Sequence, residues 1–515
     1  MLIFLLFSIV STENIIKNPS FEDFDSNNKL LYWNIPESVE ISSVSHSGKK
    51  SLKLKIKEKS VNFNQAIKLD KGFQYEVCAH IKFSNNVRRR LLGMKIRSHN
   101  FDENYDSRSY YGWTDWQKVC ITTPSIKKPS KYSDPYYFSL YSYSTDQYSE
   151  GYVDDISVKR INFRIGIAND RDEVNDRVNV IYQIFGDKQT YNLSDFELKT
   201  RIRDNNKIFC ENNIKISSFF FTNSISIKIF NLKINNYYQV ESILNNKKDN
   251  IKEVSLYTFK KINKIKRNVT YDEYGRIFIN DELFFPIGIY TSILTEYKLD
   301  LINRTHINTL LTNLQLNKNI LNKIQKMKMK IVYSINFTSI TNPNPNTDFQ
   351  KGENYKKYIV GRVNEFKDYP GILAYYINDE MPFYYNKDIR NITLTIHELD
   401  RNHPALTVIM PFGEMPSLLN TTDLMGVDNY PIGNSKVSNV YYINSRDNEV
   451  ALGKPQVQVN QIYDMFAYND TISGKPKPPT LQEMRSMSWQ NIVLGAKGLL
   501  FYSLYEIIKL NSTTP

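Results

Sequence analysis

The sequence predicts a multidomain fold in which two β-sandwich segments precede a (β/α)8 TIM barrel. With 515 residues, the chain is too long for a single hydrophobic core. From residue 18 to about residue 264, short runs of alternating polar and apolar residues are separated by turn residues, as in antiparallel sheets. From Tyr271 onward, strand-like runs alternate with helical patterns, which is typical of a parallel sheet.

The predicted segments follow one another along the chain. Residues 1–12 contain the apolar run from Leu2 to Val10 and predict a secretory signal peptide, although the usual basic n-region is missing. Residues 13–161 predict the first β-sandwich. Residues 162–264 have the strand spacing of an immunoglobulin-like β-sandwich, which we expect to space or buttress the last domain. Residues 271–515 predict the barrel.

The composition argues for export and against nucleic-acid binding. The net charge of +12 comes mostly from lysines scattered among Asn and Ile, a compositional bias, and the patch Arg88–Arg90 is expected to be a solvated loop. After the leader, no run approaches the ~20 apolar residues of a membrane helix, so no integral membrane segment is predicted. A secreted, extracellular glycoprotein is expected from the leader and from eight Asn-x-Ser/Thr sequons. The sequons begin at Asn192, Asn268, Asn303, Asn336, Asn391, Asn420, Asn469 and Asn511.

The three cysteines allow one internal disulfide. Cys78 and Cys120 both lie in strand-like runs of the first sandwich and are the predicted pair, which leaves Cys210 over. No metal-ligand spacing is present, so no metal site is predicted from the sequence.

Eight apolar runs are the predicted barrel strands. They are 284–290, 308–311, 330–335, 371–377, 405–409, 424–427, 455–459 and 498–502. Helical patterns fall between most of them, including 319–329 and 481–496, the latter after a Pro-Pro-Thr stop and cap. Because the chain ends at Pro515, soon after the last strand, it is expected to be truncated at its C-terminus, as a fragment of a longer product.

The run from Gly371 to Glu380 ends a buried strand in an amide and two acids. Barrels of this type carry their chemistry at the C-terminal ends of the strands. A carboxyl group there is shielded by the core, which raises its pKa toward that of a general acid. The alternative is structural, since acids also suit the N-terminus of a following helix, where Asp379 and Glu380 would then lie.

The ends of the other predicted strands add polar side chains to the same mouth. Amides and phenols there would suit a polyhydroxylated ligand, because each hydroxyl both donates and accepts. Asp428 is expected either to be catalytic or to cap the loop before Pro431. The predicted substrate-binding residues are Tyr290, Asn336, Asn378, Asp379, Tyr430, Gln458, Gln461 and Tyr502.

Motifs of the first segment occur in a recognisable order. They are Asn18-Pro19-Ser20-Phe21-Glu22, Trp33, Ser45 to Leu52, Trp116 to Val119 and Tyr152 to Ile156. Together they resemble carbohydrate-binding modules with a galactose-binding-like jelly-roll fold. The resemblance implies a glycan site on a concave face and, in some members, a structural calcium ion near the first and last motifs. The candidate sugar-stacking residues are Tyr110, Tyr111, Trp113, Tyr141 and Tyr143, each of which could instead belong to the core.

The last segment resembles a glycoside hydrolase barrel of the large retaining superfamily, in a branch with an Asp-Glu-Pro signature on strand four. The resembling stretches are Gly275 to Tyr290, Tyr369 to Glu380, Gly426 to Gly433 and Pro479 to Leu499. The resemblance implies that Glu380 is the acid/base. One departure is minor, since Met381 follows Glu380 and Pro382 comes one place late. The other matters more, because a retaining enzyme needs a second carboxylate about 5 Å away, and strand seven has no acid until Asp464.

Three mechanisms follow from this departure. Glu380 could be the acid and Asp428 the base of an inverting pair. Asp379 or Glu506 could supply the second acid, although Asp379 is expected to point away from its neighbour Glu380. The barrel could also bind glycan without cleaving it.

The sequence therefore predicts a secreted glycoside hydrolase acting on a poly- or oligosaccharide, with carbohydrate as its partner and no cofactor. The alternative is a non-catalytic glycan-binding or adhesion protein with a degenerate hydrolase barrel.

Overall fold

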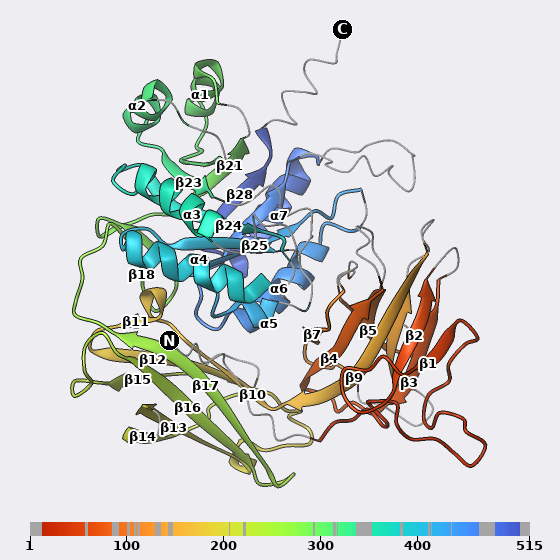
Figure 1. Cartoon of the computed structure of the whole chain (residues 1–515). Coiled ribbons are helices and arrows are strands. Elements are labelled where there is room, and N and C mark those ends of the chain that lie inside the picture. Colours follow the sequence, from red (N-terminus) through yellow and green to blue (C-terminus); the bar gives the residue numbers. More distant parts are fainter. Residues whose placement is uncertain are drawn as a thin grey trace.

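The computed structural model describes most of residues 13–504. The internal ranges outside the description are 57–59, 85–91, 100–103, 108–109, 111–113, 129–134, 143–147, 205–206, 220–222, 292–293, 313–315, 317, 336–352, 382–384, 410–412, 414, 434 and 463–478. The predicted signal peptide, the patch Arg88–Arg90 and the C-terminal residues after 504 therefore lie outside the described residues. In Figure 1 two β-rich units lie below a barrel of strands and helices, coloured green to blue.

The first unit is a sandwich of two antiparallel sheets. One sheet has the order β1 (Val39–Ser42), β2 (Ser51–Ile56), β9 (Ser149–Ile161), β4 (Gln74–Phe83) and β7 (Gln117–Thr122). The other has the order β3 (Asn62–Ile67), β8 (Tyr136–Ser142), β5 (Leu92–Ser98) and β6 (Asn104–Asp106). Trp33 is buried between them, with its ring centroid 5.3 Å from that of Phe21 and 5.8 Å from that of Phe63. The motif residues Phe21 and Trp33 therefore build the core.

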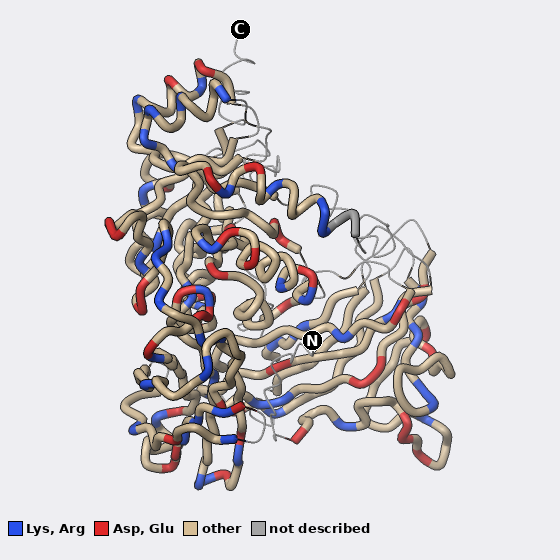
Figure 2. Tube along the Cα trace, turned by 60° about the vertical axis from the view of Figure 1, so that its left-hand side comes forward, with Lys and Arg blue, Asp and Glu red and all other residues tan. Residues whose placement is uncertain are grey.

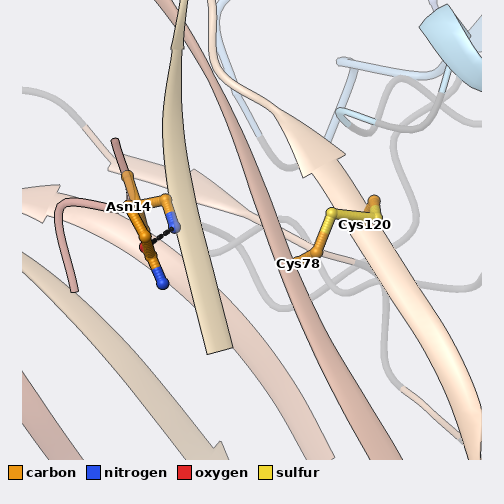
Figure 3. The surroundings of a disulfide bond; sticks show 4 residues. Asn14, Cys78 and Cys120 are labelled. Atoms are coloured by element: carbon orange, nitrogen blue, oxygen red, sulfur yellow. Dashed lines mark hydrogen bonds between the residues drawn. A yellow bond between two sulfur atoms is a disulfide. The ribbon is translucent and has the colours of Figure 1, made fainter. Parts of the chain in front are cut away.

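The predicted disulfide is confirmed. Cys78 on β4 faces Cys120 on β7 in the antiparallel ladder, and their sulfur atoms are bonded. Figure 3 shows the bond beside the N-terminal segment, where Asn14 Oδ1 accepts a hydrogen bond from Val158 N at 2.9 Å. Cys210, on the second sandwich, is the free cysteine.

The second unit is also a β-sandwich. A three-stranded sheet of β10 (Phe163–Ile167), β12 (Arg177–Ile184) and β15 (Asn223–Lys228) packs on a five-stranded one. The larger sheet has the order β11 (Glu173–Val174), β17 (Ile251–Lys261), β16 (Tyr237–Asn246), β13 (Phe196–Asp204) and β14 (Lys207–Ile214). Short 3-10 turns occupy Asp170–Asp172 and Leu193–Asp195. The buried apolar residues of both sandwiches form one continuous cluster.

The third unit is a closed barrel of eight parallel strands, preceded by the hairpin strands β18 (Val269–Tyr271), β19 (Ile277–Ile279) and β20 (Glu282–Leu283). The barrel strands are β21 (Ile287–Thr291), β22 (Thr309–Thr312), β23 (Lys330–Ser334), β24 (Ile372–Asp379), β25 (Ala405–Ile409), β26 (Leu424–Asn429), β27 (Val457–Gln461) and β28 (Gly498–Tyr502). The helices are α1 (Glu296–Asn303), α2 (Lys318–Lys326), α3 (Glu353–Phe366), α4 (Asn386–Leu399), α5 (Met415–Leu418), α6 (Asn439–Ala451) and α7 (Leu481–Val493). The predicted fold class is therefore confirmed.

Strand alternation sorts the barrel residues into two faces. One buried cluster fills the barrel interior and includes Val332, Ala374, Tyr376 and Leu500. A second cluster lies between the strands and the helices, and its strand residues alternate with those of the first. Only the interior set continues upward into the mouth, so the face on which a residue lies decides whether it can reach a ligand.

Charged residues of both signs are spread over all three units in Figure 2, rather than gathered into one basic face. Among the described residues, no helix is both long and apolar enough to cross a membrane.

A buried ion pair ties the second sandwich to the barrel. Lys454, in the loop after α6, places its Nζ 2.8 Å from Oδ1 of Asp172, and both side chains are almost fully buried. Tyr257 also donates to this oxygen, at 3.1 Å. Next to it, Arg171 donates through Nη2 to the carbonyl oxygens of Val269 at 2.8 Å and Asn402 at 3.1 Å. The sandwich is therefore held to the barrel by charge as well as by apolar contact.

Replacing Lys454 by Met should destabilise the protein by about 3 kcal/mol, the lower end of the range for a broken buried pair, because the Asp172 carboxylate would stay buried with only Arg390 Nη1, 4.0 Å away among the described residues, to balance its charge. Lys247→Met is the matched control. Lys247 pairs with Glu197 at the surface, where both side chains are more than half exposed, and its loss should cost less than about 1 kcal/mol. Thermal unfolding of the two variants measures the difference, and equal melting temperatures would contradict a role for the buried pair.

Candidate active site

Three carboxyl groups meet at the C-terminal mouth of the barrel. Asp379 and Glu380 follow one another at the end of β24, and Asp428 lies near the end of β26. The side chains of Glu380 and Asp428 hydrogen-bond to each other, and the charge of Asp379 also acts on Asp428. Such a group of acids is costly, because neighbouring carboxylates repel one another.

An irregularity in β24 brings two consecutive acids to the same place. The register with β25 shifts between Tyr376 and Asn378, and Glu380 has a left-handed backbone with φ of 52°. The chain nevertheless stays attached to β25, because Glu380 N donates to Val408 O at 2.9 Å. The prediction that Asp379 points away from Glu380 assumed a regular strand, in which neighbouring side chains face opposite sides. Because the strand is irregular here, that prediction is wrong.

The proton balance of the cluster is set by burial. Asp428 is only 7% exposed. Burial and the negative charges of Glu380 and Asp379 raise its pKa well above the usual range. The pKa of Asp379 is also raised, because neighbouring protein atoms keep water from part of its carboxyl group and because Glu380 is negatively charged. Two features limit this shift: the hydrogen bond that Tyr376 donates to Asp379, and the exposure of the Asp379 side chain to solvent. Asp428, which is hydrogen-bonded to Glu380, therefore keeps its proton to a higher pH than an ordinary carboxyl group does.

Four tyrosines surround these acids. The ring centroid of Tyr502 lies 5.1 Å from that of Tyr290 and 6.2 Å from that of Tyr430. Tyr376 donates its hydroxyl to Asp379 Oδ1 at 2.6 Å and also hydrogen-bonds to Tyr290. The predicted residues Tyr290, Tyr430 and Tyr502 are thus placed at the mouth together with the acids.

Tyr376 was not among the predicted site residues. The signal that could have identified it is alternation, because it follows the interior residue Ala374 by two positions along β24. Its hydrogen bond orients Asp379 toward the mouth.

Two of the predicted binding residues, Asn378 and Gln458, make hydrogen bonds inside the protein instead. Asn378 is fully buried, and its Oδ1 accepts from Met381 N at 2.9 Å. Gln458 lies between the interior residues Val457 and Val459, so its side chain is on the other face, where its Oε1 accepts from Val427 N at 3.1 Å. Their predicted contact with substrate is not supported by these positions.

Gln461 follows the interior residues Val457 and Val459 in the alternation along β27, so its side chain is on the interior face. Its amide group nevertheless hydrogen-bonds to the backbone. Its Oε1 accepts from Ile432 N at 2.9 Å and its Nε2 donates to Ile432 O at 3.1 Å, with only 2% of the residue exposed. Gln461 therefore fixes the loop after β26, which places Tyr430. The predicted binding residue Asn336 and the candidate acids Asp464 and Glu506 lie outside the described residues.

The candidate sugar-stacking residues of the first sandwich separate into groups. Tyr110 is buried in the core. Tyr141 is partly exposed on β8, with Lys95 Nζ 4.5 Å from its ring centroid. Tyr111, Trp113 and Tyr143 lie outside the described residues.

The carboxylates near the calcium position implied by the resemblance serve another purpose. Glu22 Oε1 accepts from Lys50 N at 2.7 Å, and both oxygens of Asp154 accept from backbone N–H groups. Calcium prefers six to eight oxygen ligands, so these residues do not fit a calcium cage and instead hold the loop of residues 43–50.

No protein-family model and no curated protein matches the sequence. Similar solved structures include a β-glucuronidase of Parabacteroides merdae, 11% identical, with 87% of this chain and 62% of that chain covered and a TM-score of 0.35. A Bacteroides uniformis β-glucuronidase is 11% identical, with 87% and 59% covered and a TM-score of 0.37. The β-galacturonidase of Eisenbergiella tayi is 10% identical, with 92% and 88% covered and a TM-score of 0.38. This chain thus spans less than two thirds of the first two, and the likeness carries no statement about substrate.

Asp428→Asn should make the protein more stable at neutral pH. A carboxyl group whose pKa is higher in the folded than in the unfolded chain keeps its proton to a higher pH in the folded chain. Its contribution to the stability of the folded state therefore falls as pH rises above the unfolded-state pKa of about 3.9. Asparagine removes this cost, and we expect a gain on the order of 1–2 kcal/mol at pH 7–8 that shrinks toward pH 4. Asp300→Asn is the control, since Asp300 pairs with Lys323 at the surface. Thermal unfolding across this pH range measures both, and a variant less stable than wild type at pH 8 would contradict the account.

Proposed function

We propose that this protein hydrolyses glycosidic bonds with Glu380 as general acid/base. The observation that carries the proposal is the convergence of Glu380, Asp428 and Asp379 at the mouth of a closed barrel. Glycosidases use two carboxyl groups, of which one protonates the leaving oxygen and the other acts toward the anomeric carbon. A ring of tyrosine side chains beside these acids supplies stacking faces and hydroxyl groups for a sugar.

The hydrogen-bonded pair supplies the proton that this reaction needs. In the ligand-free arrangement the raised pKa of Asp428 keeps this proton in the pair, and the hydrogen bond holds Glu380 and Asp428 closer together than the roughly 5 Å of retaining or 6.5–9.5 Å of inverting pairs. A sugar entering the mouth would part the two groups, and transfer of this proton from Asp428 to Glu380 would place it beside the glycosidic oxygen and leave Asp428 as a carboxylate. Asp428, or Asp379 held by Tyr376, then acts as the second carboxylate.

The electrostatics favour a neutral sugar. The groups that shift the pKa values of Asp379 and Asp428 are acids and a tyrosine, and no Lys or Arg is among them. A sugar carboxylate would therefore meet repulsion from these acids, and no Lys or Arg of the described residues offsets it at Asp379 or Asp428.

Export of the chain is also proposed. The disulfide between Cys78 and Cys120 suits an oxidising compartment. The sequon residues Asn192, Asn268 and Asn303 are exposed, as acceptors of N-linked glycans must be.

The central experiment compares Glu380→Gln and Asp428→Asn on two kinds of substrate. With aryl glycosides of poor leaving groups and with polysaccharides, Glu380→Gln should lower kcat/KM by about 10²–10⁴-fold, because protonation of the leaving oxygen is lost. With dinitrophenyl glycosides, whose leaving group needs no proton, Glu380→Gln should keep most of its kcat/KM. Asp428→Asn should lose it if Asp428 is the second carboxylate, and Asp379→Asn should lose it if Asp379 is. Glu365→Gln, at an exposed position of α3, is the matched control.

Two results would overturn the proposal. Wild-type rates in both variants would exclude the acid pair from the chemistry. If wild type cleaves none of these glycosides and polysaccharides but binds a glycan, the barrel is a recognition domain. The absence of an acid from β27 is the observation that favours this alternative.

A neutral aryl glycoside should be cleaved faster than the matched uronide, by at least tenfold in kcat/KM, about 1.4 kcal/mol of repulsion. Glucoside and glucuronide pairs of the same anomeric configuration test this. Preference for the uronide would show that a cation reaches the sugar from elsewhere in the chain.

A further inference from the structure

Two histidines and an aspartate converge on the first sandwich, far from one another in sequence. The ligand atoms of His46, His80 and Asp155 all lie within 4.8 Å of one another. Nδ1 of His46 is 2.6 Å from Asp155 Oδ2, and Nδ1 of His80 is 4.0 Å from the same oxygen. The two imidazole rings are stacked, with centroids 3.7 Å apart.

His80 has an unused ligand atom that faces this cluster. Its Nδ1 is buried and has no hydrogen-bond partner among the described residues. A buried polar atom without a partner costs free energy, and the 4.0 Å gap to Asp155 is too long for a hydrogen bond. Burial and the neighbouring His46 lower the pKa of His80 to about 4, so the ring is neutral at pH 7 and its nitrogen is available for coordination.

The surrounding backbone and hydroxyl groups hold the three side chains in place. Asp155 has a left-handed backbone, and its other oxygen, Oδ1, accepts from Ser20 Oγ at 2.7 Å and from Ser47 Oγ at 2.6 Å. His46 N donates to Asp154 Oδ2 at 2.8 Å, which fixes the loop that carries His46. Oδ2 of Asp155 is thereby turned toward the two rings. Outer contacts of this kind orient the ligands in metal sites.

We propose that His46, His80 and Asp155 bind a divalent transition-metal ion of the zinc class. Imidazole nitrogen and carboxylate oxygen form bonds of about 2.0–2.2 Å to zinc. Binding therefore lengthens the 2.6 Å contact and shortens the 4.0 Å one. It also tilts the two nearly parallel rings until their in-plane nitrogen lone pairs point at one ion. Two imidazole ligands favour zinc, copper or nickel over calcium. Three protein ligands leave a fourth position for water or a ligand atom.

The site would have a structural consequence. It joins the loop of residues 43–50 to the sheet strands β4 and β9, which carry His80 and Asp155. An ion that binds the folded chain and not the unfolded one raises the melting temperature, and above its Kd the rise grows with the logarithm of the ion concentration. Sequence spacing could not reveal the site, because no short motif contains two of its ligands.

The test is titration of the full chain with Zn²⁺ after treatment with a chelator, followed by calorimetry and thermal unfolding. Wild type should bind one ion at the site with a rise in melting temperature, and His80→Gln should weaken this binding by at least about tenfold. His99→Gln is the matched control, because His99 is exposed in the same sandwich and should leave the affinity unchanged.

A second measurement does not depend on how the variants fold. The His46 ring centroid lies 5.8 Å from that of Trp116, so Cu²⁺ in the site should quench part of the tryptophan fluorescence of wild type. Because Cu²⁺ binds such sites more tightly than Zn²⁺, saturating Zn²⁺ should raise the Cu²⁺ concentration needed for half-maximal quenching. Absence of Zn²⁺ binding to wild type, equal affinity in folded His80→Gln, or a half-quenching Cu²⁺ concentration that Zn²⁺ leaves unchanged would overturn the proposal.

Discussion

The arrangement of the mouth depends on how β24 ends. In a regular parallel strand, alternate residues face the interior, and two neighbouring acids cannot both do so. The register shift after Tyr376 and the left-handed backbone of Glu380 remove this restriction, while the bond from Glu380 N to Val408 O keeps the chain in the barrel wall. A non-glycine residue in this conformation stores strain, which is found most often at functional sites.

The same irregularity creates the electrostatic state of the site. Because Asp379 and Glu380 both act on Asp428, the most buried of the three acids holds its proton at higher pH than an ordinary carboxyl group. The barrel wall next to Asp428 is fixed by hydrogen bonds. The side-chain amides of Gln458 and Gln461 accept from backbone N–H groups of β26 and of the loop after it. The second sandwich, attached through the buried pair of Lys454 and Asp172, braces the barrel from another side.

Much of the architecture could be predicted from the sequence. The alternation of runs gave the barrel, the order of motifs gave the first sandwich, and the strand-like surroundings of Cys78 and Cys120 gave their disulfide. Where a strand is regular, as at Tyr290 and Asp428, the residue read as the end of the strand lies at the mouth, and its role in binding or catalysis stays a prediction. Gln458 was expected to contact substrate because it lies near the end of a strand, but the alternation of side chains along β27 places it on the other face. The direction of the Asp379 side chain could not be predicted, because a register shift leaves no pattern in the sequence.

The central claim is that Asp428, hydrogen-bonded to Glu380, keeps its proton above the pH at which an ordinary carboxyl group ionises. Infrared difference spectroscopy at pH 7 tests it directly, because a protonated carboxyl group has its own carbonyl stretch, separate from that of a carboxylate. The spectrum of wild type minus Asp428→Asn should contain this band, and Glu380→Gln should shift it by changing its hydrogen bond. Other buried acids, such as Glu253, are common to both proteins and cancel. A difference spectrum with only carboxylate bands would mean that both groups are ionised, which would contradict the account of the site.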